Sequence, residues 1–101
     1  MNYYDVLGRI HSELLPRTYV EVGVRHGESM RLASPGTRAV GIDPVPDLRY
    51  DLSHVDLTVA TCTSDDYFGD ADRLIADLET TSFDFAFIDG MHQFEFVLRA
   101  R

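Results

Sequence analysis

Lysine and tryptophan are absent from this sequence of 101 residues, and cysteine occurs once, at Cys62. A single cysteine excludes an internal disulfide framework and a zinc site built from several cysteines. All nine basic residues are arginines, so the sequence offers no catalytic lysine. Acidic residues outnumber basic residues by 17 to 9, and the net charge of -8 argues against the basic surface that nucleic-acid binding needs. We therefore expect no nucleic-acid partner.

Long apolar runs are also missing. No stretch approaches the roughly 18 apolar residues of a membrane-spanning helix. The first residues lack the basic and apolar regions of a signal peptide. With 45% hydrophobic and 26% charged residues, the composition is that of one ordinary globular domain. We expect a single cytoplasmic domain over residues 1–101, with no membrane partner.

The spacing of the apolar residues predicts the order of helices and strands. A helix ending before Pro16 is expected over residues 3–15, ahead of a core at residues 18–101. Strands rich in β-branched and aromatic residues are predicted at 18–24, 38–43, 55–61 and 82–89. Further helices are predicted at 27–33, 66–78 and 93–100.

Side-chain expectations accompany these elements. Ser64 or Asp65 is expected to cap the helix at 66–78. The predicted apolar face of that helix is formed by Phe68, Leu74, Ile75 and Leu78. Cys62 is expected to pack as a small apolar residue, and His11 and His54 are expected to be exposed.

Strands that alternate with helices indicate βαβ units, and therefore a parallel sheet of the α/β class. The carboxyl ends of parallel strands meet at one edge of such a sheet, where open α/β folds bind their ligands. Glycine or polar residues stand at each predicted strand end, namely Glu21 and Gly23, Asp43, Thr63 and Ser64, and Asp89. We therefore expect one binding site at that edge.

Gly23 and Gly27 follow the first predicted strand. Glycines there permit a tight turn and a close approach of backbone to ligand. Arg25 breaks the full dinucleotide fingerprint Gly-x-Gly-x-x-Gly, which disfavours a nicotinamide-dependent dehydrogenase. Asp43 comes about 20 residues after Gly23, where an acid that binds ribose hydroxyls is typically found. The alternatives are purely structural turns at the glycines and at Asp43-Pro44.

Four motifs occur in order along the chain. They are Glu-x-Gly-x-x-x-Gly-x-Ser at residues 21–29, Gly-Ile-Asp-Pro at 41–44, Thr-Ser-Asp-Asp-Tyr-Phe at 63–68, and Phe-Asp-Phe-Ala-Phe-Ile-Asp-Gly-Met-His at 83–92. Together they resemble the class I S-adenosylmethionine-dependent methyltransferases, in particular small-molecule O-methyltransferases whose fourth strand ends in Ile-Asp-Gly-x-His. The resemblance spans residues 18–101. It implies a three-layer, Rossmann-like open parallel sheet with strand order 3-2-1-4, truncated relative to the seven strands of that family.

The resemblance also implies a role for each matching residue. The methionine part of the cofactor would be surrounded by Glu21, Gly23, Val24, Gly27 and Ser29. Asp43 would hold the ribose, and Ser64 and Asp65 the adenine. Asp89 would contact the cofactor and act as a catalytic residue that, in metal-dependent members, binds Mg²⁺ and holds the acceptor hydroxyl, whereas His92, three residues on, would be the catalytic base. The alternative is that Asp89 caps a helix and His92 lies on its surface.

The implied function is methyl transfer from S-adenosylmethionine to a hydroxyl of a small-molecule acceptor. The alternative function is a non-catalytic cofactor-binding or assembly module that retains half of the methyltransferase fold. A fourth strand left open at the edge of the sheet would invite edge-to-edge pairing. We therefore expect a homodimer formed through the fourth-strand edge.

Overall fold

The computed structural model describes residues 2–80, 82–89 and 94–98. Its elements, in chain order, are α1 (Tyr3–Leu14), β1 (Thr18–Val22), the 3-10 helix η1 (Met30–Leu32), β2 (Arg38–Ile42), β3 (Asp56–Ala60), α2 (Ser64–Phe68), α3 (Ala71–Leu78), β4 (Phe85–Asp89) and β5 (Phe94–Leu98). The predicted first helix and the four predicted strands are confirmed, each within its predicted range.

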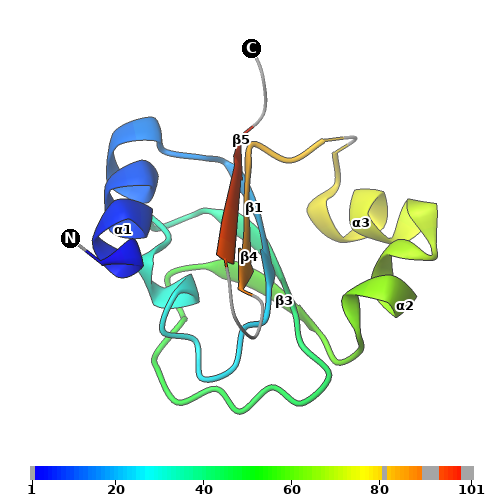
Figure 1. The fold of residues 1–101 in the computed structure, drawn as a ribbon. Coiled ribbons are helices and arrows are strands. Elements are labelled where there is room, and N and C mark those ends of the chain that lie inside the picture. The colour runs from blue at the N-terminus through cyan, green and yellow to red at the C-terminus, as the bar shows by residue number, and fades with distance from the viewer. Residues whose placement is uncertain (1, 81, 90–93, 99–101) are drawn as a thin grey trace.

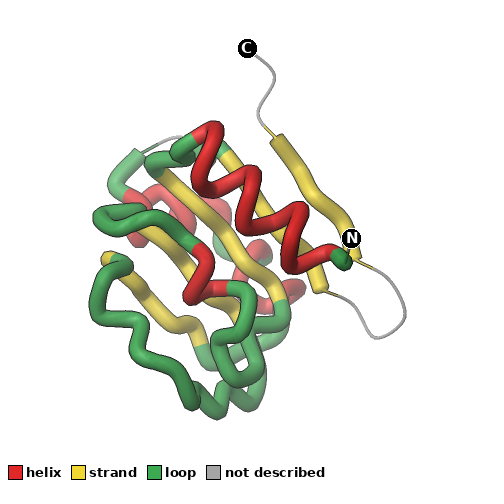
Figure 2. Tube along the Cα trace, turned by 90° about the vertical axis from the view of Figure 1, so that its left-hand side faces the viewer, coloured by secondary structure: helices red, strands yellow, loops and turns green. Residues whose placement is uncertain are grey.

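The strands form one sheet in the order β3-β2-β1-β4-β5. β1 pairs in parallel with both β2 and β4, and β2 pairs in parallel with β3. β5 runs antiparallel to β4 along the outer edge (Figure 2). The predicted α/β class is therefore confirmed, together with the 3-2-1-4 order of the first four strands. The sheet is compatible with a Rossmann-like fold.

Alternating side chains of the strands face two helical layers, one on each side of the sheet (Figure 1). On one side, residues of α1 and η1 pack against aromatic side chains of the strands: Leu7 and Met30 against Tyr19, Phe85 and Phe87. On the other, residues of α2 and α3 pack against smaller side chains: Tyr67 and Leu78 against Val20, Val40, Ile42 and Ala86. Complete burial of each large side chain stabilises the fold by about 1.5–3 kcal/mol.

α1 begins with a capping box, in which the Asp5 N–H donates to Asn2 Oδ1 at 3.0 Å and the Asn2 N–H donates to Asp5 Oδ2 at 3.2 Å. The helix ends where Leu15 takes a left-handed φ of 47°. Leu7 and His11, one turn apart, are fully buried against the sheet. The expected exposure of His11 is therefore wrong. His54 is half-buried, with Nε2 3.0 Å from the Ala33 carbonyl oxygen.

The helix predicted at 66–78 is two helices. Thr63, rather than Ser64 or Asp65, caps α2, because its Oγ1 accepts the Asp66 N–H at 3.1 Å. α3 starts anew after Asp70, whose side chain accepts the Asp72 N–H and so competes with a continuous helix. The break changes which residues face the sheet: Tyr67 is buried, whereas the predicted-face residues Phe68 and Ile75 are 48% and 42% exposed.

The helix predicted at 27–33 is reduced to η1, because the chain from Gly23 to Ser29 stays a loop that bonds to the segment after β2. The helix predicted at 93–100 is wrong over 94–98, where the chain forms β5. Only Phe94-Glu95-Phe96 alternates apolar and polar residues as a strand does, so the sequence of this segment does not by itself separate strand from helix. In β5, Phe96 stacks on Phe87, with ring centroids 5.2 Å apart. Residues 93, 99 and 100 lie outside the described part.

The fourth strand is consequently not an edge, because β5 pairs with it along its whole length. The dimer was predicted because β4 was expected to be an open edge, and β4 does not offer that edge. Within residues 2–80, 82–89 and 94–98, no helix has the length and apolar character needed to cross a membrane.

Candidate functional site

The site lies where the order of the strands reverses. From β1 the chain proceeds outward to β2 and β3, and then returns to place β4 on the other side of β1. Because these four strands are parallel, their carboxyl ends share one edge (Figure 1). Open α/β sheets bind ligands outside that edge, at the point of reversal between the two central strands. Here that point lies between the end of β1 and the end of β4.

Gly23 and Asp89 occupy this point of reversal. Gly23 has a φ of +88°, in the left-handed region that favours glycine. A Cβ added to Gly23 would lie 2.6 Å from the Asp89 carbonyl oxygen. Gly23 is therefore required for the close approach of the β1 and β4 ends. A substitution there would disturb the sheet as well as any ligand.

Asp43, at the end of β2, binds the loop that follows β1. Its Oδ2 accepts the Arg25 N–H at 2.8 Å, and its Oδ1 accepts the Val45 N–H at 2.8 Å. Asp43 as a whole is only 7% exposed. Arg25 takes a left-handed φ of 53° and still presents its N–H to Asp43. Asp43 therefore does form the turn that the sequence offered as the alternative to ribose binding.

The loops after β1 and β2 are joined by backbone hydrogen bonds. The Asp47 N–H donates to the Arg25 carbonyl at 3.0 Å, and the Arg49 N–H donates to the His26 carbonyl at 2.9 Å. Gly27, at φ +92°, lies under Leu52, whose Cδ1 would be 3.2 Å from an added Cβ. Two loops that carry predicted cofactor residues are therefore held as one layer over the sheet edge.

Glu21 and Tyr19 form a buried pair on β1. They lie on the same face of the strand, and the Tyr19 hydroxyl donates to Glu21 Oε1 at 2.6 Å. Glu21 is fully buried, and its Oε2 has no hydrogen-bond partner within the described ranges. Burial raises the pKa of Glu21 to about 8, the hydrogen bond from Tyr19 lowers it in part, and the negative charges of Asp89 and Glu28 raise it further.

Asp89 belongs to the same electrostatic group. Desolvation raises the pKa of Asp89 above its usual value, Arg25 opposes this, and Glu28 adds to it. The pKa of Tyr3, at the start of α1, is also raised, mainly by burial and in part by the negative charges of Asp89 and Glu28. Glu21, Glu28 and Asp89 therefore form a set of mutually repelling carboxyl groups, which we call the acidic cluster. Glu28 was missed from the sequence, although it follows Gly27 directly.

The remaining predicted cofactor residues lie on separate segments of the chain. Val24 is buried above Gly41, whose added Cβ would lie 2.6 Å from Val24 Cγ2, so its side chain is not available to a ligand. Ser29 is buried at the start of η1. Ser64 and Asp65 form the first turn of α2, beyond the end of β3.

The described residues include only part of the predicted catalytic and metal-binding set. His92 lies outside the described residues. In the described part, no three histidine, cysteine or acidic side chains are grouped as metal ligands. Among the described residues, Asp89 is the one predicted Mg²⁺ ligand, and we derive no step through Mg²⁺.

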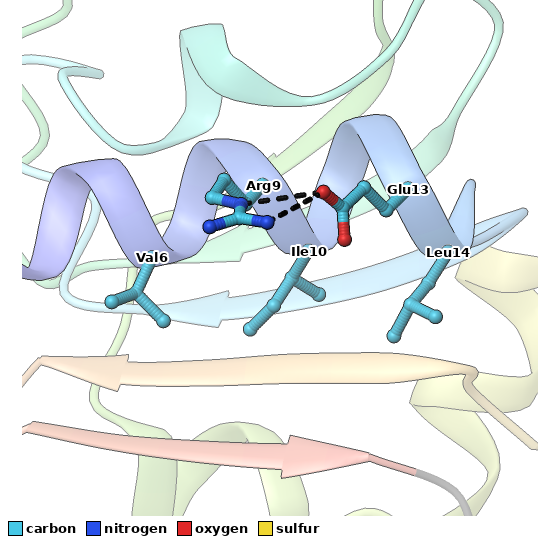
Figure 3. Close-up of a pocket in the computed structure, with 5 residues that line it drawn as sticks. All are labelled: Val6, Arg9, Ile10, Glu13 and Leu14. Carbon is cyan, nitrogen blue, oxygen red and sulfur yellow. Dashed lines mark hydrogen bonds and ion pairs between the residues drawn. The ribbon is translucent and has the colours of Figure 1, made fainter.

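A separate groove of about 300 Å³ runs along α1. Val6, Ile10 and Leu14 point from the helix towards β4 and β5, while Arg9 and Glu13 pair with each other at 3.0 Å (Figure 3). None of the predicted site residues lines it. Its apolar lining and internally neutralised charges give it no reactive group.

Comparisons with known proteins add no assignment. A scan against protein-family models and a search of curated proteins both found no match.

Proposed function

We propose that this protein binds S-adenosylmethionine at the carboxyl ends of β1, β2 and β4 and transfers its methyl group to a hydroxyl of a small-molecule acceptor. The observation that carries the proposal is the contact between Gly23 and Asp89 at the point of strand reversal. Two residues that the resemblance assigns to the cofactor meet there, although 66 positions of sequence separate them.

Asp43 is compatible with ribose binding. Each carboxylate oxygen accepts one backbone N–H and retains capacity for a second hydrogen bond. Its two existing bonds hold the carboxyl in one orientation at the end of β2, which lowers the entropy that a ligand must remove. Asp43 would therefore act on the ribose directly and on the methionine end through the loop that it anchors.

The bound sulfonium would supply an already activated methyl group. Its sulfur would keep the electron pair of the C–S bond as the methyl group passed to the acceptor oxygen, and the acceptor hydroxyl would have to lose its proton to a base. The chain's own contribution is mainly alignment of acceptor, methyl group and sulfur. Asp89, at the reversal point and with a raised pKa, would orient the acceptor. His92 remains the predicted base.

The antiparallel pairing of β5 with β4 favours a second function, the non-catalytic cofactor-binding or assembly module. The sequence predicts a helix after the fourth strand, whereas Phe94–Leu98 form the strand β5, antiparallel to β4. The acceptor side of the site would then be incomplete while the cofactor side is retained. Methyl transfer to a panel of phenols and other small hydroxyl compounds separates the two functions.

Titration calorimetry with S-adenosylmethionine, S-adenosylhomocysteine and NAD tests the binding proposal. We expect saturable binding of the two adenosyl compounds and none of NAD. A S-adenosylhomocysteine analogue without ribose hydroxyls should bind about 10–100-fold more weakly, since a hydrogen bond to a carboxylate is worth about 1.5–3 kcal/mol. Changing the ligand avoids the loop disturbance that an Asp43 substitution would cause. Equal affinity for the analogue would exclude Asp43 as the ribose ligand.

A further inference from the structure

Glu21 is the one residue of the acidic cluster that is fully buried. Its carboxyl receives a single hydrogen bond, from Tyr19, and the second oxygen has no partner in the described part of the chain. A buried carboxylate normally needs several donors or a positive partner to remain ionised. Among the residues that the structure describes, Glu21 has one donor and no positive partner within hydrogen-bond distance, so the free protein favours the protonated acid.

The groups that face Glu21 reinforce this state. On β1, Tyr19 donates its hydroxyl proton to Glu21, and the His11 ring of α1 packs at a right angle to the Tyr19 ring, with centroids 4.5 Å apart. Asp89 at the end of β4 and Glu28 in the loop before η1 both repel a negative charge on Glu21. Tyr3 of α1 is neutral, and Arg25 acts on Asp89. Glu21 thus sits in a predominantly negative field.

We infer that Glu21 carries a proton in the ligand-free protein and releases it when the positively charged S-adenosylmethionine binds, so that the site distinguishes this cofactor from its neutral product. The inference rests on the proposed function and assigns Glu21 as a specificity-determining residue. S-adenosylmethionine carries one more positive charge than S-adenosylhomocysteine, at the sulfur. That charge beside Glu28 and Asp89 offsets the repulsion that keeps the proton on Glu21.

The coupling follows from linkage. A ligand that favours ionised Glu21 binds more tightly as pH rises, because less work is then needed to remove the proton. The proton that leaves Glu21 goes to solvent, and the negative charge left on Glu21 then attracts the positive charge of the ligand through the protein, because Glu21 itself is fully buried. After methyl transfer the sulfur is neutral, Glu21 regains a proton, and the affinity gained from the charge is lost. The product is thereby released more easily than the cofactor is.

Calorimetry in two buffers of different ionisation enthalpy measures the proton directly. At pH 7 we expect close to one proton released per S-adenosylmethionine bound, and close to none per S-adenosylhomocysteine. Between pH 6 and 7.5, the dissociation constant for S-adenosylmethionine should fall by about tenfold per pH unit relative to that of Glu21→Gln. The ligand's own amino group titrates equally in both proteins, so the difference isolates Glu21.

Glu13→Gln is the matched control, because Glu13 is an exposed glutamate on α1 that pairs with Arg9. It should release the proton as the parent protein does. Carbon NMR of the Glu21 carboxyl in the unmodified, ligand-free protein provides a second readout, with a midpoint expected at about 8. A midpoint below 5, or equal proton release with the two ligands, would overturn the inference while leaving cofactor binding intact. Failure of both ligands to bind would overturn the proposed function and the inference with it.

Discussion

At the scale of single residues, three buried ionisable groups differ in how completely they are hydrogen-bonded. Asp43 accepts two backbone N–H groups, Glu21 accepts one hydroxyl, and both ring nitrogens of His11 are without a partner in the described ranges. An unpaired buried polar atom destabilises a fold by about 1–3 kcal/mol. Asp43 is thus compatible with stability, whereas Glu21 and His11 are retained at a cost.

His11→Leu should stabilise the protein by about 1 kcal/mol at pH 7, because it removes two unpartnered nitrogens from an apolar contact with Tyr19 and Phe85. The matched variant His54→Leu should destabilise it, since His54 Nε2 lies within hydrogen-bond distance of two carbonyl oxygens. Urea denaturation measures both. A His11→Leu protein less stable than the parent would contradict this account of the ring.

The burial of His11 also predicts that the free energy of unfolding depends on pH. Burial lowers the pKa of His11 from 6.5 to about 4, so the unfolded chain binds the proton more readily than the folded protein. Stability is therefore lost as pH falls from 6.5 towards 4, by about 2 kcal/mol at pH 5. The difference in unfolding free energy between His11→Leu and the parent should widen by this amount from pH 7 to 5. A constant difference would show that His11 titrates normally.

At the scale of elements, the turn after β3 is set by Thr63. Thr63→Ala should destabilise the protein by about 1 kcal/mol, because α2 loses the acceptor for the Asp66 N–H. Ser64→Ala, one residue later, should cost less than 0.5 kcal/mol or so, since no capping bond is lost. Thermal unfolding of the two variants compares them. An equal loss of stability in the two variants, or a larger loss in Ser64→Ala, would show that Ser64 caps the helix, as the sequence predicts.

Regular elements with a clear apolar period could be predicted from the sequence, whereas contacts between distant segments could not. The parallel strands follow from their β-branched and aromatic runs, and the site edge follows from their direction. Phe94–Leu98 is too short for its period to separate strand from helix, and only stacking of Phe96 on Phe87 decides it. Asp43 was correctly placed at a strand end, but its bond to Arg25 depends on the fold. The Tyr19–Glu21 pair could have been found from their spacing of two residues in a strand.

At the scale of the whole molecule, β5 forms the outer edge of the sheet in the part that the structure describes. Val97 and Leu98 on this strand are 37% and 50% exposed. The homodimer stays a prediction, now expected through β5 rather than β4. Sedimentation should give twice the chain mass of 11.4 kDa at micromolar concentration, and Val97→Lys should give the monomer, because an edge lysine disfavours strand pairing. A monomeric parent protein would refute it.

The central claim is that the carboxyl edge of β1, β2 and β4 binds S-adenosylmethionine, and amide chemical-shift mapping with S-adenosylhomocysteine tests it most directly. The neutral product is the suitable probe because it should leave the Glu21 proton in place. We expect saturable shifts at Gly23, Arg25, Asp43 and Ser64, with little change along the groove of α1. No saturable shifts, or shifts confined to Val6, Ile10 and Leu14 in that groove, would contradict the account.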